Sequence, residues 1–312
     1  MGAHRTNILL EMMTLSGCIS WFHWKLFLHL PREAWRQYFS QRGRWQFSGT
    51  ALALIVALSA CSTPTRPRAI HDELAEGKPL PYEPPTMKRA ALPPLPPVAP
   101  RVVVRGARKV RLVALTFDAC STEGPSKYDE RITQVLLAMH APATLFLGGK
   151  WMEEWPEQTR YLASIPQFEL GNHTFLHPHM TTVSDERARA ELQWTQEIMY
   201  DLTGRQATLF RAPYGEFDER IVRLAAEAGM TTIQYDLASG DPDVHVTKNR
   251  LVEYVTTVAK NGSIIVMHIN GRGWQTADAL PRIIKRLRKR GFKLVTVSEL
   301  MRHQAAAEAK GR

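Results

Sequence analysis

Cysteine is nearly absent from this sequence, which contains only Cys18, Cys61 and Cys120 in 312 residues. Cys18 and Cys61 lie in an N-terminal stretch that precedes the globular part, so the globular part keeps a single thiol. One thiol cannot form an intramolecular disulfide. Core packing therefore has to supply the stability of the domain, and an apolar content of 44% is sufficient for a sizeable core.

A long uninterrupted apolar run is also lacking. Residues 8–30 are fairly apolar, but Glu11, His23 and Lys25 interrupt them, which argues against a clean membrane span.

The basic residues form no patch that is typical of nucleic-acid binding. The net charge is +10, but the basic residues are scattered along the chain, and their densest cluster, 285–290, contains no aromatic residue. We therefore expect no nucleic-acid partner. The cluster is interpreted as the solvated face of a helix, with a weaker case for attraction to anionic envelope polymers or lipid headgroups.

A secretion signal lies far from Met1. Arg42 and Arg44 precede the apolar run 51–57, which leads into Leu-Ser-Ala-Cys. This tetrapeptide resembles the lipobox of bacterial lipoproteins, so we expect Cys61 to be the lipidated first residue of the mature protein. The alternatives are an ordinary signal peptide or an uncleaved anchor. The expected location is the cell envelope, as a membrane-anchored lipoprotein that faces the periplasm or the exterior.

The chain divides by composition into four parts. Residues 1–61 form the leader, for which a downstream translation start and an unusually long leader both remain open. Residues 62–100 are rich in proline, favour extended polyproline II structure and are expected to tether the domain. Residues 101–303 have the regular patterns of a catalytic domain, and residues 304–312 form a polar tail.

Strand-like and helix-like segments alternate within the domain. Apolar runs predict seven strands, at 110–118, 143–147, 168–172, 208–212, 231–236, 263–268 and 293–297. Amphipathic segments predict helices at 129–139, 184–202, 219–228, 248–260 and 277–289. Such alternation is typical of βαβ units, so the predicted class is α/β, a distorted (β/α) barrel of about seven parallel strands.

Ionisable residues follow several of these strands directly. The sequence Gly-Asn-His-Thr-Phe-Leu-His contains His173 and His177, whose neutral imidazole nitrogens can converge on one metal ion. Other apolar runs end in Asp118, in Arg211 and in His268. Because the strands of an α/β barrel open on one face at their carboxyl ends, we expect these residues to meet there.

The chain thus contains, in this order, Thr-Phe-Asp at 116–118, His-Thr-Phe-Leu-His at 173–177, Arg-Ala-Pro-Tyr at 211–214 and an apolar strand ending in His268. In this order the motifs resemble those of the NodB-like polysaccharide deacetylases, carbohydrate esterase family 4. The resemblance covers about residues 110–300. It implies the NodB-like deacetylase fold and the hydrolysis of N-acetyl groups on a polysaccharide.

The resemblance and the chemistry of amide hydrolysis agree on the first half of the site. A divalent ion held by His173 and His177 would activate a water molecule, with zinc favoured and cobalt or nickel as alternatives. Asp118 would take the proton of that water. By analogy, Arg211 would hold the Asp118 carboxylate. Taken singly, Asp118 could instead cap a turn and Arg211 could be a structural ion-pair partner.

The second half of the site concerns the leaving group and the oxyanion. His268 would protonate the departing nitrogen, and a buried carboxylate would orient it. Asp241 is the preferred carboxylate, with Asp236 as the open alternative. The backbone N–H of Tyr214 would stabilise the oxyanion, although residues 213–215 could be only a strand-ending turn.

One position departs from the family pattern. The family has a second aspartate, a metal ligand, after the catalytic one, whereas this chain has Ala119 followed by Cys120. Asp118 itself could coordinate, Cys120, Glu123 or Asp129 could fill the place, or metal binding could be weak. Thiolate is a good zinc ligand, but on sequence alone we favour a buried apolar role for Cys120.

Four residues are candidates for substrate binding: Pro213, Tyr214, Asn270 and Trp274. Trp274 can stack on a sugar face or merely pack over the barrel mouth.

The sequence therefore predicts a metal-dependent hydrolase that removes N-acetyl groups from an envelope or extracellular polysaccharide of the N-acetylglucosamine type. One alternative, favoured by Ala119, is a catalytically impaired glycan-binding lipoprotein. Asp118, Arg211 and His268 argue against it, because a pure binder needs neither an acid nor a positioned base. The other alternative is a hydrolase of another acyl group, such as a formyl amide or an O-acetyl ester.

Overall fold

The computed structural model describes residues 81–83, 85, 92–122 and 126–309, all within the second of the chain's two compact units, Arg68–Arg312. The leader, the lipobox with Cys61, most of the proline-rich linker and Glu123 lie outside the described residues. Within the described ranges, no helix combines the length and the apolar character that crossing a membrane requires.

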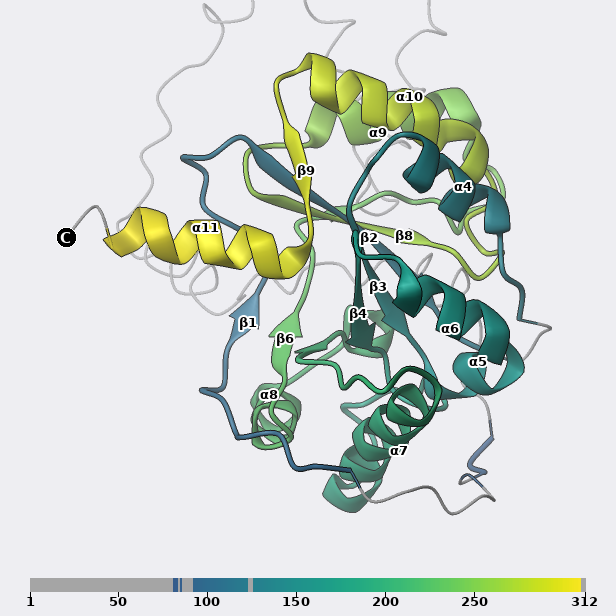
Figure 1. Cartoon of the computed structure of the whole chain (residues 1–312), viewed down its shortest axis with the longest axis vertical. Coiled ribbons are helices and arrows are strands. Elements are labelled where there is room, and N and C mark those ends of the chain that lie inside the picture. The colour runs from purple at the N-terminus through teal and green to yellow at the C-terminus, as the bar shows by residue number, and fades with distance from the viewer. Residues whose placement is uncertain (1–80, 84, 86–91, 123–125, 310–312) are drawn as a thin grey trace, which may run out of the picture. The chain divides into compact units, whose positions relative to one another are not determined.

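A nine-stranded parallel sheet forms the centre of the domain (Figure 1). Its order is β1-β6-β5-β4-β3-β2-β8-β7, and β9 pairs with β2. The strands are β1 (Val102–Val103), β2 (Leu112–Ala119), β3 (Ala143–Leu147), β4 (Phe168–Asn172), β5 (Leu209–Phe210), β6 (Thr231–Ile233), β7 (Leu237–Ala238), β8 (Ser263–His268) and β9 (Lys293–Val295). Arg105, just after β1, bridges Ser263 at the start of β8, which brings the two sides of the curved sheet together.

All seven predicted strands are present, and the predicted α/β class with a distorted parallel barrel is confirmed. The strands β1 and β7 were not predicted, because two residues are too few to show a period.

Helices pack around the sheet, and side chains set where four of them begin. Asp129, Ser184, Asp218 and Thr247 each accept a backbone N–H from the next turn, which satisfies donors that a helix start leaves unpaired. The helices are α4 (Glu130–Ala138), α5 (Gly149–Glu154), α6 (Pro156–Ser164), α7 (Asp185–Thr203), α8 (Glu219–Glu227), α9 (Lys248–Val258), α10 (Thr276–Lys289) and α11 (Val297–Ala309). Of these, α5, α6 and α11 were not predicted.

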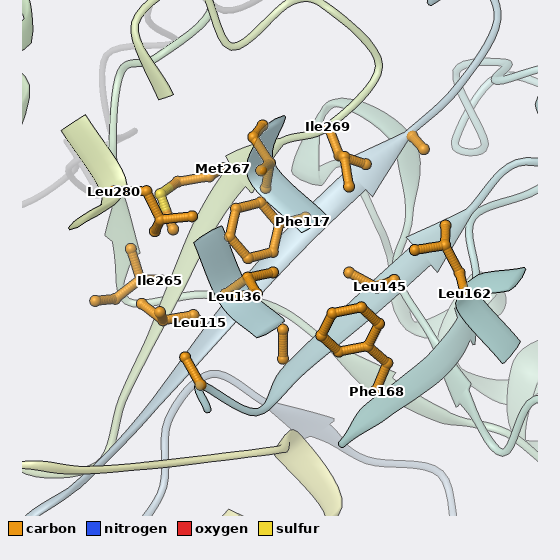
Figure 2. Packing of buried hydrophobic residues seen from close by; sticks show 14 of the residues in the cluster. Leu115, Phe117, Leu136, Leu145, Leu162, Phe168, Ile265, Met267, Ile269 and Leu280 are labelled. Atoms are coloured by element: carbon orange, nitrogen blue, oxygen red, sulfur yellow. The ribbon is translucent and has the colours of Figure 1, made fainter. Parts of the chain in front are cut away.

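The side chains of β2 point alternately toward the hydrophobic core and toward the candidate site. Four of its side chains belong to the main hydrophobic cluster: Val113, Leu115, Phe117 and Ala119. Figure 2 shows part of this cluster, in which Leu136 of α4 and Leu280 of α10 pack with the side chains of the strands. Thr116 and Asp118 project to the opposite face, because side chains alternate along a strand. There, both accept hydrogen bonds from Arg211.

The last residues of the predicted linker contact the domain. Residues 92–100, which we assigned to the linker, lie against the domain. Val98 N–H donates to Ala226 O at 3.0 Å, and the Gln206 side chain donates to Pro93 O at 2.8 Å. This part of the chain is extended as expected, but it is attached to the domain surface.

The C-terminal boundary differs from the prediction. Helix α11 runs to Ala309, so residues 304–309 continue a helix and are not a separate polar tail. Val297 and Leu300 start this helix in a hydrophobic cluster with Leu112 of β2. That tertiary contact turns a short apolar run, which we predicted as the end of a strand, into the first turn of a helix.

Candidate active and metal site

The predicted site residues converge at the carboxyl ends of the parallel strands. Asp118 of β2 lies directly beside His268 at the end of β8. Strands β4 and β5 are also paired neighbours, and they lead into His173 and Arg211. The four side chains are only 1–6% exposed. Charges in the site are therefore poorly screened by water, and their mutual positions matter strongly.

Arg211 holds the carboxylate of Asp118. Its Nη1 donates to Asp118 Oδ1 at 2.7 Å and to Thr116 Oγ1 at 2.8 Å. The guanidinium carbon lies 4.0 Å from the centroid of the Phe146 ring, which packs under it. Asp118 Oδ2 lies 3.9 Å from His173 Nε2. The ion pair thus fixes one oxygen of the carboxylate and directs the other toward the histidines.

The structure defines which nitrogen His173 offers to the site. Its Nδ1 lies 2.9 Å from the carbonyl oxygen of Arg211. Because a carbonyl only accepts, Nδ1 carries the hydrogen and Nε2 keeps its lone pair. Burial lowers the pKa of His173, and burial with the neighbouring His173 lowers the pKa of His177 well below its ordinary value. Both rings are therefore neutral at pH 7, the form that binds metal.

Cys120 lies close to His173 and His177. The ligand atoms of Cys120, His173 and His177 all lie within 4.8 Å of one another, and the three residues are buried. Two imidazoles and one thiolate suit a catalytic zinc site, in which three protein ligands leave the fourth position for water. These residues fit a divalent ion. Cys120 is buried, as we predicted, and its sulfur also lies close to both histidines.

The other candidates for the third ligand are placed differently. Asp129 caps α4 and pairs with Arg131 at 2.7 Å. Among the residues that the structure describes, Asp118 does not belong to the group of mutually close ligand atoms. Glu123 lies outside the described residues.

Asp241 orients His268. Its Oδ1 lies 2.9 Å from His268 Nδ1, and its Oδ2 accepts the backbone N–H of the same histidine at 2.8 Å. The hydroxyls of Ser239 and Thr276 also donate to this carboxylate, at 2.9 and 2.6 Å. Burial alone would raise the pKa of Asp241, but His268 and Thr276 outweigh it and the pKa is lowered. The ionised carboxylate only accepts, so Nδ1 of His268 carries the hydrogen of this contact.

Asp236, the alternative partner, lies elsewhere. It pairs with Arg108 at 2.7 Å and accepts the backbone N–H of Ile264, near the start of β8. Asp236 is therefore at the opposite end of that strand from His268.

Tyr214 lies beside the histidines in the short turn η3 (Pro213–Gly215), with a φ of 57°. Its ring centroid lies 4.5 Å from that of His177, and it stacks on His179 at 4.1 Å. His179 Nδ1 is in turn 3.0 Å from Glu216 Oε2. Sequence reasoning missed His179. The only feature of the sequence that could have indicated His179 was its position two residues after His177.

The predicted substrate-binding residues separate into two groups. Trp274 is 52% exposed, and its backbone N–H donates to Asp241 O, so its ring is available next to the site. Pro213 and Asn270 are buried. The Asn270 amide donates to Cys120 O at 2.8 Å and lies 3.4 Å from Cys120 Sγ. Asn270 thus contacts Cys120, one of the three candidate metal ligands.

Glu191 of α7 holds the loop between the two histidines. Its Oε2 accepts the backbone N–H groups of Phe175 and Leu176, both at 2.7 Å, and Arg187 donates to its Oε1 at 2.8 Å. Glu191 is fully buried, and burial raises its pKa. No motif marked this residue. The available signal was a charged residue on the buried face of a predicted amphipathic helix.

The loop needs this support because its backbone is unusual. Thr174 and His177 adopt positive φ values of 62° and 56°, which residues other than glycine rarely adopt.

Replacing Glu191 by alanine is expected to lower the free energy of unfolding by about 2–4 kcal/mol, because two buried N–H groups lose their acceptor. Urea-induced unfolding measures the change. Gln193→Ala, at an exposed position of the same helix, is the matched control and should stay within about 0.5 kcal/mol of wild type. Equal stability of the two variants would show that Glu191 does not hold the loop.

The sequence is similar to those of known deacetylases. Residues 105–233 match the family model described as polysaccharide deacetylase. A peptidoglycan-N-acetylglucosamine deacetylase of Bacillus cereus is 29% identical over 197 residues, which are 62% of this chain and 90% of that protein. Another B. cereus protein of the same name is 30% identical over 201 residues, which are 64% of this chain and 70% of that protein.

Solved structures share the fold. A peptidoglycan N-acetylglucosamine deacetylase superposes with a TM-score of 0.59 at 28% identity, covering 64% of this chain and 92% of that one. A carbohydrate esterase family 4 pseudoenzyme from Bacillus anthracis gives a TM-score of 0.59 at 26% identity, covering 65% and 69%. With these relatives and the motifs at the carboxyl edge of its sheet, the chain belongs to the polysaccharide deacetylase family, carbohydrate esterase family 4, and to its class of hydrolases.

Proposed function

We propose that this protein is a metal-dependent deacetylase that removes N-acetyl groups from an N-acetylglucosamine-type glycan of the cell envelope. The observation that carries the proposal is a set of two buried pairs, Asp118 with Arg211 and His268 with Asp241. Asp118 and His268 lie side by side on the neighbouring strands β2 and β8, whereas Arg211 follows β5 and Asp241 follows β7. Similar proteins are named for peptidoglycan N-acetylglucosamine and N-acetylmuramic acid. Peptidoglycan is therefore the first substrate to test.

The first step of the hydrolysis falls to Asp118. A divalent ion held by His173 and His177 would polarise the carbonyl and lower the pKa of the attacking water toward about 7. Asp118, held through Oδ1 by Arg211, accepts the proton of the attacking water as its oxygen bonds to the carbonyl carbon. The backbone N–H of Tyr214 donates to the developing oxyanion.

The second step falls to His268. The ring acts in its doubly protonated form. Its Nε2 gives a proton to the amide nitrogen as the carbon–nitrogen bond breaks, which releases acetate, leaves a free amine on the sugar and returns the ring to its neutral form. Asp241 keeps Nδ1 of the same ring in the donating form throughout. Exposed Trp274, beside Asp241, is the residue that we propose to stack on the sugar.

A glycan-binding protein without catalysis is the second candidate. Ala119 and the similarity to a solved pseudoenzyme favour it. Against it, Asp118 and Asp241 are buried carboxylates, and burying a charge lowers stability unless the charge is well paired. A binder has no need for such a pair of sites, which supports hydrolysis as the first proposal.

Acetate release by the full chain, loaded with zinc or cobalt, tests the proposal. The substrates are peptidoglycan and N-acetylglucosamine oligomers, with N-formyl and O-acetyl analogues compared at equal concentration. We expect acetate and free amine in equal amounts from the N-acetyl glycans. Binding of the glycans without release of any acyl group would favour the second candidate, and release only from the formyl or O-acetyl analogues would reassign the acyl group.

We further propose that Cys61 carries a lipid and anchors the domain to a membrane, which the sequence at 58–61 supports. Cys61→Ala is expected to abolish labelling by a fatty-acid probe in a bacterial host and to remove the protein from the membrane fraction. Unchanged fractionation of this variant would favour an uncleaved apolar anchor.

A further inference from the structure

We propose that Cys120 supplies a thiolate as the third protein ligand of the metal ion, in place of the carboxylate that the family has at position 119. The inference deepens the proposed function and rests on it only for the reaction. Metal binding by these side chains can be measured without any substrate.

The alternation of side chains along β2 explains why the proposed ligand is residue 120 and not residue 119. Ala119, the last residue of the strand, is fully buried in the hydrophobic cluster on the helix-facing side. Side chains alternate along a strand, so Asp118 and Cys120 share the side of the site. With this backbone, a carboxylate at position 119 would enter an apolar cluster. Position 120 is the first beyond Asp118 whose side chain reaches the two histidines.

The surroundings of the sulfur suit a negative charge. The Asn270 amide, which donates to the Cys120 carbonyl, also lies 3.4 Å from Sγ as a potential donor. Arg272 of the same loop donates to Thr122 Oγ1 at 2.7 Å. Its guanidinium therefore contacts the residue that lies two positions after Cys120 in the sequence. Hydrogen-bond donors and nearby positive charge stabilise a thiolate and orient it as a ligand. Asn270 is therefore a positioning residue for the metal site.

The donor set also selects the metal. Thiolate and imidazole together favour zinc or cobalt over magnesium or calcium, which prefer oxygen ligands. Three protein ligands would leave one tetrahedral position open for water, as in other catalytic zinc sites. Loss of the carboxylate at position 119 is then a change of ligand type and not a loss of the site.

Cobalt titration of the full chain tests the proposal, because cobalt reports the identity of its ligands by absorption. Wild type is expected to show a sulfur-to-cobalt charge-transfer band in the near ultraviolet. Cys120→Asp should bind cobalt without this band, and Cys120→Ala should bind it about 100-fold more weakly or worse. Zinc-edge X-ray absorption of the wild type should find one sulfur at about 2.3 Å.

Two variants separate a ligand from its support. Asn270→Ala should keep the charge-transfer band and weaken cobalt binding by about 10- to 100-fold. Ser121→Ala, next to the cysteine but with its hydroxyl on Glu154, is the matched control and should leave the affinity unchanged. A band that survives in Cys120→Ala, or a wild type that binds cobalt without the band, would overturn the proposal. A thiolate site in a protein that releases no acetate would uphold it and contradict only the proposed function.

Discussion

Replacing Asp118 by asparagine is expected to lower kcat for acetate release by about 10²- to 10⁴-fold, the range that a general base contributes. The amide is nearly isosteric and can still accept from Arg211, so the fold should be kept, but it cannot take a proton from water. Steady-state kinetics on an N-acetylglucosamine oligomer, with bound metal measured in the same samples, gives the result.

The metal content decides between the two roles that the sequence allowed for Asp118. Because Asp118 lies outside the group of close ligand atoms, we expect Asp118→Asn to bind metal as tightly as wild type. A variant that loses both metal and activity would make Asp118 a ligand. Full activity would remove it from the reaction altogether.

Replacing Asp241 by asparagine is expected to lower kcat by a similar factor of about 10²–10⁴, for a different reason. When the amide turns its NH₂ group to His268 Nδ1, that nitrogen has to accept, so the neutral ring carries its hydrogen on Nε2 and is a far weaker acid than the imidazolium that the Asp241 carboxylate stabilises. The two donors that share Oδ2, His268 N–H and Thr276, keep an acceptor only if the amide oxygen takes that place. We therefore expect the KM to change little while kcat falls.

The same variant changes the pH dependence of stability. The folded state lowers the pKa of Asp241, so its ionised form stabilises the fold. This contribution is fully present above the unfolded pKa of about 3.9 and is lost as the pH falls through the folded pKa. The difference in unfolding free energy between wild type and Asp241→Asn should therefore be largest near pH 7 and shrink below about pH 4.

Asp236→Asn is the matched control for activity, since Asp236 was the alternative partner of His268 but pairs with Arg108 at the other end of β8. It is expected to lower stability and to leave kcat within about 2-fold of wild type, because it contacts none of the reacting groups. A large loss of kcat in Asp236→Asn with none in Asp241→Asn would reverse this assignment.

The strand pattern of the domain could be predicted because it is a local property. The runs that became β2, β3 and β8 are mostly apolar and are buried along their whole length, as parallel strands covered on both faces are. Helix α11 could not be predicted in the same way. Val297 and Leu300 complete a cluster with Leu112, and the sequence around them does not show which residues lie there in space.

The types of residue at the candidate site could be predicted from the sequence. The hydrogen bonds that hold these residues could not. Asp118, His173, Arg211 and His268 each follow an apolar run, and parallel strands bring such ends together. The choice of Asp241 over Asp236 depends on which end of β8 each loop reaches. Glu191 contributes through two backbone N–H groups of a distant loop, and such contacts leave no periodic trace in the sequence.

By itself, the sequence determined the α/β class, the family and the candidate residues Asp118, His173 and His268, because hydrophobic period and motif order can be read along the chain. Only the tertiary structure showed that Cys120 lies close to the two histidines. Ala119 and Cys120 are adjacent in sequence, but the end of β2 turns one toward the hydrophobic cluster and the other toward His173 and His177. The direction of a side chain at a strand end depends on the neighbouring strands and helices, and therefore on residues far away in the chain.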